Sequence, residues 1–206
     1  SLLVLEAGTD QQKKNLLPKV SNGDLIMTLA LLEANADYQA SDVQLAARAS
    51  GDGFVLNGTK LLVPSAQVAD WMVVVARTGS GASPEAGISL FLVETKSPGV
   101  SITPVVTIAL DKQAEVAFHN CHVPKNNLLG GLGHGWASLS KVLQKAAVMQ
   151  CAEVAGMAEK VLEISVDWSK QRVQYDQQIG SYQLVASKLV DVLRNFQGTR
   201  AAAFFA

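Results

Sequence analysis

The spacing of apolar residues differs between the middle of the chain and its two ends. From about residue 25 to residue 123, short runs of apolar and β-branched residues alternate with turn signals. Such runs predict short strands, at about 25–32, 44–50, 54–56, 60–63, 71–76, 88–93 and 115–123. The dipeptides Asp52-Gly53 and Asn57-Gly58 predict hairpin turns among them. Seven or so short strands separated by turns favour an antiparallel β-barrel or sandwich.

Helical patterns lie on both sides of this β-rich region. Thr9 and Gln12 form a capping-box pattern at the start of one helix, which Pro18 is expected to end. Apolar residues then recur at helical spacing over residues 136–170, and again from Tyr182 to the end of the chain. The C-terminal part of the chain is therefore expected to contain a long pair of helices.

This order of elements predicts an α+β multi-domain protein. Residues 1–19 are expected to end an N-terminal helical domain, residues 20–128 to form a middle β-domain, and residues 129–206 to begin a C-terminal α-helical bundle. The chain starts and stops inside helical patterns that lack boundary signals. We therefore expect it to be truncated at both ends.

Composition and charge exclude several classes of function. The 206 residues are 49% apolar and 17% charged, which is typical of a globular protein. The formal net charge of −1 gives no basic surface for a nucleic-acid partner. No apolar run reaches the roughly 18 residues that cross a membrane. Two cysteines are too few for a disulfide scaffold, so we expect reduced thiols in a cytoplasmic protein.

Two weak motifs carry no chemistry in this interpretation. The glycines of residues 130–135 follow a loop rather than a strand of a βαβ unit, so they predict a hinge into the long helix and not a dinucleotide cradle. On a strand, His119 and Cys121 share one face while His122 points to the other. Two ligands at most would result, and a structural zinc site needs four, so no metal is expected.

Several longer motifs occur in a defined order. Residues 8–13 read Gly-Thr-Asp-Gln-Gln-Lys, and residues 52–60 read Asp-Gly-Phe-Val-Leu-Asn-Gly-Thr-Lys. Between them stand Leu32-Glu33-Ala34 and Ser41-Asp42, and Arg172 is followed at a fixed distance by Gln183. In this order and spacing the chain resembles the acyl-CoA dehydrogenase superfamily along almost its whole length.

The resemblance implies a flavin-dependent α,β-dehydrogenation of an acyl-CoA thioester. In this family a glutamate base removes the α-proton, and the β-hydrogen passes as hydride to N5 of FAD. The resemblance also implies a homo- or hetero-tetramer, with FAD shared across a subunit interface. An electron-transfer flavoprotein is the implied electron acceptor, and fatty acid or sterol degradation by β-oxidation is the implied pathway class.

The resemblance also assigns candidate site residues. The strand that contacts the isoalloxazine ring corresponds to Leu29, Leu31 and Leu32, and a second segment against the ring corresponds to Leu62, Val63 and Pro64. Ser41 corresponds to a serine near the flavin and CoA phosphates, and Gln144 is a second substrate-binding candidate. The residues that reach the FAD of a neighbouring subunit correspond to Arg172, Gln174, Tyr175 and Gln183. A guanidinium suits a pyrophosphate because it forms bidentate charge-assisted hydrogen bonds.

The departures from the family pattern cluster at the flavin. Leu32 and Ala34 replace the threonine and proline of a Thr-Glu-Pro segment, Leu62 replaces a tryptophan, and Pro64 replaces a residue whose hydroxyl donates to N5. An arginine of the long helix falls on Ala147. The catalytic base is expected beyond Ala206, and the alternative base position falls on Ala146, so no catalytic residue is identified within the chain.

Two functions therefore stay open. Losing two hydroxyl donors and an indole costs several kcal/mol of cofactor binding, at about 1 kcal/mol per neutral hydrogen bond and a comparable aromatic contribution. The chain either belongs to an active FAD-dependent acyl-CoA dehydrogenase with an unusual pocket or is a non-catalytic partner subunit. In the second case it completes the FAD site of the other chain in a heteromeric enzyme.

Overall fold

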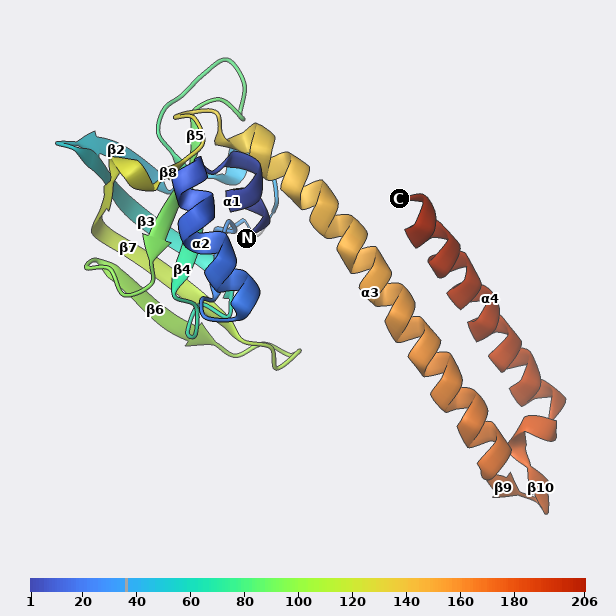
Figure 1. Ribbon diagram of the computed structural model, residues 1–206. Helices are drawn as coiled ribbons and strands as arrows, with labels where there is room; N and C mark the ends of the chain where they lie inside the picture. Colours follow the sequence, from blue (N-terminus) through green and yellow to red (C-terminus); the bar gives the residue numbers. More distant parts are fainter. Residues whose placement is uncertain (36) are drawn as a thin grey trace. The chain divides into compact units, whose positions relative to one another are not determined.

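The chain forms two compact units, Ser1–Val142 and Leu143–Ala206 (Figure 1). The computed structural model describes residues 1–35 and 37–206. The first unit contains the helices α1 (Leu2–Ala7) and α2 (Asp10–Asn22) and the 3-10 turns η1 (Ala40–Asp42) and η2 (Lys125–Asn127). Its strands are β1 (Met27–Ala30), β2 (Ala46–Ser50), β3 (Gly53–Pro64), β4 (Trp71–Arg77), β5 (Ile88–Glu94), β6 (Val100–Val105), β7 (Gln113–Pro124) and β8 (Leu128–Leu129).

These strands form one mixed sheet. The hydrogen-bonded order is β6-β7-β3-β2-β4-β5-β8, and β1 joins it by pairing with β4. The pairs β1–β4 and β2–β4 are parallel, and the remaining pairs are antiparallel. Within the described residues, β6 and β8 stay at the two ends of this order, so the sheet does not close into a barrel. The predicted β-domain is confirmed, but its all-antiparallel barrel form is corrected, because apolar patterns identify strands and not their pairing.

The core of the first unit is formed by buried apolar side chains of the strands. The rings of Phe54 and Phe91 are 5.0 Å apart and tilted by 59°, a favourable edge-on arrangement. Around them pack buried residues of β3, β4, β5 and β7, among them Leu56, Met72, Val74, Val93, Val116 and Phe118. At about 25 cal/mol per Å² of buried apolar surface, this core is the main source of stability in the unit.

Two local predictions about the N-terminal helix have different outcomes. The capping box is confirmed, because the Thr9 side chain accepts from the Gln12 amide while the Gln12 side chain accepts from the Thr9 amide. The prediction that Pro18 ends the helix is wrong. The helix α2 continues to Asn22 and ends at Gly23, whose φ of 81° suits a left-handed cap.

The dipeptide Asn57-Gly58 does not turn the chain, contrary to the prediction. Strand β3 runs through it, with a register shift against β7 and a φ of 139° at Gly58. A Cβ at Gly58 would lie 3.1 Å from Leu45, so the dipeptide marks a bulge where another strand comes close. The β2–β3 hairpin is confirmed, although its two-residue loop is Gly51-Asp52, one residue earlier than expected.

Strand β7 contains a second irregular residue. Asn120 has a φ of 51°, and its amide donates to the Asn57 side chain over 2.8 Å. This kink breaks the alternation of faces, so Cys121 is buried while His119 is exposed. The expectation that His119 and Cys121 share a face is therefore wrong. Among the described residues, no group of three or more His, Cys, Asp and Glu side chains could hold a metal ion.

The second unit is a helical hairpin. It contains most of α3 (Gly135–Gln171), the short strands β9 (Val173–Gln174) and β10 (Gln177–Gln178), the turn η3 (Ile179–Ser181) and α4 (Gln183–Phe205). Tyr175 and Asp176 join the two strands with φ values of 51° and 60°, as in the tight turns that hairpins favour. Both predicted helices are present. Within the described residues, none of the helices combines the length and apolar character needed to cross a membrane.

Candidate functional site

An excursion from the sheet carries three of the predicted flavin-contact residues, Leu31, Leu32 and Ser41. Strand β1 pairs with Trp71–Val74 of β4, and β2 rejoins the same strand with Ala46 opposite Arg77. Between these two contacts, the chain from Leu31 to Leu45 leaves the sheet; we call this segment the platform loop. Its position is fixed at both ends, because both flanking strands share β4 as their neighbour.

A buried ion pair ties the platform loop to β3. The Lys60 Nζ atom lies 2.7 Å from Glu33 Oε1 and donates over 2.9 Å to the Leu31 carbonyl oxygen. Glu33 in turn accepts from the main-chain amides of Gln44 and Leu45, each over 3.0 Å. Lys60 is fully buried, and this burial lowers its pKa, while the adjacent Glu33 carboxylate acts in the opposite direction. One carboxylate therefore joins the two ends of the platform loop.

The end of β3 next to this pair is strained. The pairing of β3 with β7 shifts register between Lys60 and Val63, which marks a β-bulge. Within and just after it, Leu62 and Ser65 have φ values of 49° and 52°. A non-glycine residue in this conformation costs about 1–3 kcal/mol, and such strain and bulges concentrate at functional sites. We call residues 61–65 the strained segment. They are a candidate binding surface.

The strained segment and the platform loop lie side by side. The Leu61 amide donates to the Leu32 carbonyl oxygen over 2.8 Å, and the Thr28 hydroxyl donates to the Pro64 carbonyl oxygen over 2.6 Å. Leu29 belongs to β1, opposite Val73, and is half-buried. The structure thus brings together all six predicted ring-contact residues: Leu29, Leu31, Leu32, Leu62, Val63 and Pro64.

These six side chains differ in how accessible they are. Leu31 and Val63 are buried in the unit, at 5% and 1% exposure. Leu32 is half-buried, whereas Leu62 is 39% exposed and Pro64 is exposed. The surface offered to a ligand is therefore apolar. Pro64 has neither a side-chain donor nor a main-chain N–H.

Ser41 lies on the same loop, in the 3-10 turn η1. Its side chain is exposed, and its carbonyl oxygen accepts from the Gln44 side chain over 2.8 Å. Sequence reasoning named Ser41 but not the ion pair that holds its loop. Lys60 closes the motif at 52–60, yet nothing local in the sequence indicates that its partner is Glu33, 27 residues earlier.

The second group of predicted residues gathers at one end of the helical hairpin, where β9 and β10 join α3 to α4 (Figure 1). Arg172 follows α3, and its guanidinium carbon lies 5.9 Å from the centre of the Trp168 ring. The Tyr182 hydroxyl donates to the Gln174 carbonyl oxygen over 2.8 Å. Gln183 is the first residue of α4, where main-chain amides lack helical partners. The side chains of all four candidates are exposed: Arg172, Gln174, Tyr175 and Gln183.

The remaining candidates lie on α3, within the second unit. Gln144 is exposed, and Ala146 and Ala147 lie less than one helical turn further on. Neither alanine can exchange a proton or bind an anion through its side chain. This stretch of α3 therefore offers one amide side chain and no acid or base at the alternative base position.

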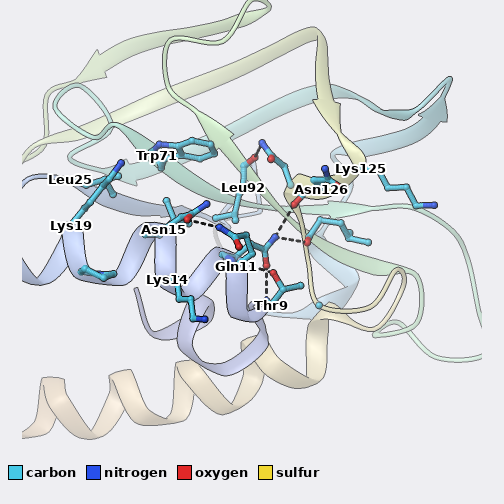
Figure 2. Close-up of a pocket in the computed structure, with 16 residues that line it drawn as sticks. Thr9, Gln11, Lys14, Asn15, Lys19, Leu25, Trp71, Leu92, Lys125 and Asn126 are labelled. Carbon is cyan, nitrogen blue, oxygen red and sulfur yellow. Dashed lines mark hydrogen bonds between the residues drawn. The ribbon is translucent and has the colours of Figure 1, made fainter.

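A large cavity lies elsewhere in the first unit, between α2 and the sheet (Figure 2). Its volume is about 1080 Å³, and Trp71, Leu92 and three lysines are among the residues that line it. Gln12 also lines it, and its side chain donates to the carbonyl oxygens of Asn126 and Leu128, each over 3.0 Å. None of the predicted site residues lines this cavity. It is therefore separate from the candidate site.

Comparison with known families assigns the chain. Residues 28–121 match the family model "Acyl-CoA dehydrogenase, middle domain", and residues 133–206 match "Acyl-CoA dehydrogenase, C-terminal domain". The chain belongs to the acyl-CoA dehydrogenase family. The candidate residues of the platform loop and of the end of β3 fall in the first matched region, and Arg172 and Gln183 fall in the second.

Individual acyl-CoA dehydrogenases support this assignment. The 2-methylacyl-CoA dehydrogenase of Solanum tuberosum is 32% identical over 204 residues, which cover 96% of this chain and 48% of that protein. The acyl-CoA dehydrogenase of Geobacillus kaustophilus has a TM-score of 0.92 at 28% identity, covering 98% of this chain and 54% of that one. A glutaryl-CoA dehydrogenase from Mycobacterium smegmatis, solved in complex with FADH2, has a TM-score of 0.88 at 25% identity, with 98% and 52% coverage. The chain thus spans about half the length of the relatives it matches.

The buried ion pair gives a stability prediction. Lys60→Met leaves the Glu33 carboxylate, whose side chain is 12% exposed, without its cation. Breaking a buried pair in this way typically costs about 3–5 kcal/mol, so we expect a markedly lower midpoint in thermal and denaturant unfolding. Lys160→Met is the matched control, because Lys160 is 69% exposed and its pair with Glu163 is worth about 0.3–0.5 kcal/mol. Equal stability of the two variants would contradict the assigned role of Lys60.

Proposed function

We propose that the protein is an acyl-CoA dehydrogenase-type flavoprotein that catalyses α,β-dehydrogenation of an acyl-CoA thioester. The observation that carries the proposal is the strained segment at Leu62 beside Leu32, which forms an exposed apolar surface held rigid by a buried ion pair. Because the chain belongs to the acyl-CoA dehydrogenase family, we interpret that surface as the binding site of the isoalloxazine ring. The proposed pathway class is fatty acid or sterol degradation by β-oxidation.

The residues of the first unit fit parts of FAD well and other parts poorly. The apolar surface of Leu32 and Leu62 suits the face of an isoalloxazine ring, and the exposed Ser41 can donate to a phosphate. The polar edge of the ring would rely on main-chain groups, because Leu32, Leu62 and Pro64 have no side-chain donor. FAD, when bound, would supply the hydride acceptor for the β-carbon. The residues of this chain would bind it, orient it and exclude water from its face.

We place the catalytic base outside this chain. The α-proton of a thioester requires a positioned carboxylate, and the family's alternative position in α3 is Ala146. Ser41 and Gln144 are the substrate-binding candidates on the chain. The complete protein would therefore combine this platform with a glutamate from another segment.

Arg172 and Gln183 are proposed to contact FAD that is held mainly by a neighbouring subunit. Three features support this role: both side chains are exposed, both lie at the same end of the helical hairpin, and Gln183 begins a helix. A helix N-terminus and a guanidinium both favour a pyrophosphate. By resemblance to the family, we propose a homo- or hetero-tetramer, with an electron-transfer flavoprotein as electron acceptor and a cytoplasmic location.

A second candidate function is that of a non-catalytic partner subunit. The observation that favours it is the loss of donors at the strained segment, where Pro64 replaces a hydroxyl residue and Thr28 already donates to the Pro64 carbonyl oxygen. In that case Arg172 and Gln183 would complete the FAD site of a different, catalytic chain. The platform of this chain would then stay without a flavin of its own.

Visible absorbance of the complete protein separates the two candidates. Purified alone, an active enzyme should carry flavin, and acyl-CoA should bleach it or drive reduction of a dye. A partner subunit should be colourless alone and should yield a flavin-loaded complex when co-expressed with a catalytic paralogue. A protein that is colourless in both preparations would refute both candidates.

Restoring a donor at the strained segment should strengthen flavin binding. Pro64→Thr adds a hydroxyl and a main-chain N–H at the polar edge of the proposed site. One neutral hydrogen bond is worth about 1 kcal/mol, so the dissociation constant for FAD should fall about fivefold in a fluorescence titration. Pro98→Thr, in the turn before β6, is the control and should leave the constant unchanged. An unaltered constant in Pro64→Thr would argue against flavin at this surface.

Removing the guanidinium should weaken FAD retention by the assembled oligomer. Arg172→Met deletes a charge-assisted bond worth about 1.5–3 kcal/mol, so the dissociation constant should rise about 10- to 150-fold. Arg194→Met in α4 is the control, because that arginine is 75% exposed and pairs with Asp191 of its own helix. Equal flavin content after gel filtration of the two variants would remove Arg172 from the FAD site.

A further inference from the structure

Arg77 occupies the point where the platform loop returns to the sheet. It is the last residue of β4, and its main-chain amide donates to the Leu45 carbonyl oxygen over 2.8 Å. Its half-buried side chain reaches both the platform loop and the loop that follows β4. Four main-chain carbonyl oxygens accept from the guanidinium: Ala40 at 2.7 Å, Val43 at 2.8 Å, Pro84 at 3.1 Å and Ala86 at 3.2 Å.

Two of these bonds fix how the Ser41 turn is oriented. In a planar trans peptide, the carbonyl and the following N–H point in opposite directions. The Val43 carbonyl points to Arg77, and the next amide, of Gln44, donates to Glu33 on the other side. The Ala40 carbonyl also points to Arg77, so the amide of Ser41 is turned away from the guanidinium. The segment from Ala40 to Leu45 thus lies between two charged side chains. The Arg77 guanidinium donates to its carbonyl oxygens, and the Glu33 carboxylate accepts from its amides.

The charge of Arg77 is not neutralised within the part of the chain that the structure describes. All four hydrogen-bond acceptors are carbonyl oxygens, and no carboxylate of residues 1–35 or 37–206 forms an ion pair with it. A half-buried cation beside Ser41 raises the electrostatic potential there, which favours an anion on the Ser41 donors. The orientation of the Ser41 turn and the positive charge of Arg77 therefore both favour an anion at Ser41.

We propose that Arg77 is a positioning residue that orients the Ser41 amide and hydroxyl toward a phosphate group of the bound ligand. This inference rests on the proposed function, in which Ser41 lies near the phosphates of FAD and of the CoA thioester. Either ligand supplies the same chemistry, a phosphate oxygen that accepts from Ser41. In this role Arg77 would act through the platform loop, whose carbonyl oxygens accept from it, and not by contact with the ring or the reacting carbons.

The test uses the complete protein, with its partner chain if FAD loading requires one. Arg77→Lys keeps the charge but cannot reproduce a fork that spans four carbonyl oxygens. We expect about a 10-fold weaker affinity for the phosphate-bearing ligand, the scale of one charge-assisted hydrogen bond. Arg48→Lys is the matched control, because Arg48 is exposed on β2 and should behave as wild type.

Ligands that lack a phosphate group show whether the phosphate that Ser41 contacts belongs to FAD or to the CoA thioester. If the phosphate belongs to FAD, Arg77→Lys weakens FAD binding and leaves riboflavin binding unchanged. If it belongs to CoA, the variant raises KM for an acyl-CoA about 10-fold, leaves kcat unchanged and does not affect the matching acyl-pantetheine thioester. Either pattern supports the inference. Equal losses for the ligands with and without phosphate would instead indicate general damage to the fold and would overturn it.

A double variant tests whether Arg77 acts through Ser41. If it does, Arg77→Lys should cause a smaller loss of affinity in the Ser41→Ala background, where only the main-chain amide is left to orient, than in the wild type, whereas independent roles would multiply the two losses. Multiplied losses would overturn the inference. An Arg77→Lys variant that binds both ligands as tightly as the wild type would also overturn it, provided that the wild type carries flavin. If the wild type takes up flavin neither alone nor with a partner, the proposed function fails first and this inference fails with it.

Discussion

The buried Lys60–Glu33 pair is the constraint on which the candidate site depends. An ammonium removed from water is tolerated only when a carboxylate and further acceptors surround it. Glu33 meets that requirement only if it approaches β3, and the Leu31 carbonyl supplies the additional acceptor. Once Glu33 is fixed there, its remaining lone pairs draw in the amides of Gln44 and Leu45. The described residues of the platform loop are thus held by one compensated charge together with the buried Val43 and Leu45 side chains.

Arg77 completes this arrangement from the other side. Glu33 accepts from amides of the platform loop, and Arg77 donates to its carbonyl oxygens. Because the amide and the carbonyl of a peptide lie in one plane, these bonds restrict rotation of the peptide planes of the loop. Hydrogen bonds to charged groups are about twice as strong as neutral ones, and here they act together with the buried Val43 and Leu45 side chains of the loop. Such a loop can display polar groups to a ligand without a large entropic cost on binding.

The sequence predicted the elements whose signals are local and missed those that depend on distant contacts. The Thr9 capping box and the two long helices follow from residues close in the chain, and both are present. Pro18 is predicted to end a helix, but packing of Leu16 and the bonds from Gln12 to the carbonyl oxygens of Asn126 and Leu128 outweigh the bond that proline removes. The two residues that organise the site bind groups 27 to 37 residues away, a separation no local pattern encodes.

The geometry of the strained segment does not depend on the side chains that the family uses there. Leu62 holds a φ of 49° because its neighbours Lys60 and Val63 are anchored, one by the ion pair and one in the core. Replacing an indole by Leu62 or a hydroxyl by Pro64 therefore leaves the main-chain surface intact while it removes side-chain donors. The apolar face proposed for a ring and the polar edge proposed to hold it are separable properties: Leu62 keeps the face apolar without an indole, whereas Pro64 would leave the edge without a side-chain donor. Whether main-chain groups alone hold a flavin is thus the physical difference between a catalytic chain and a partner subunit.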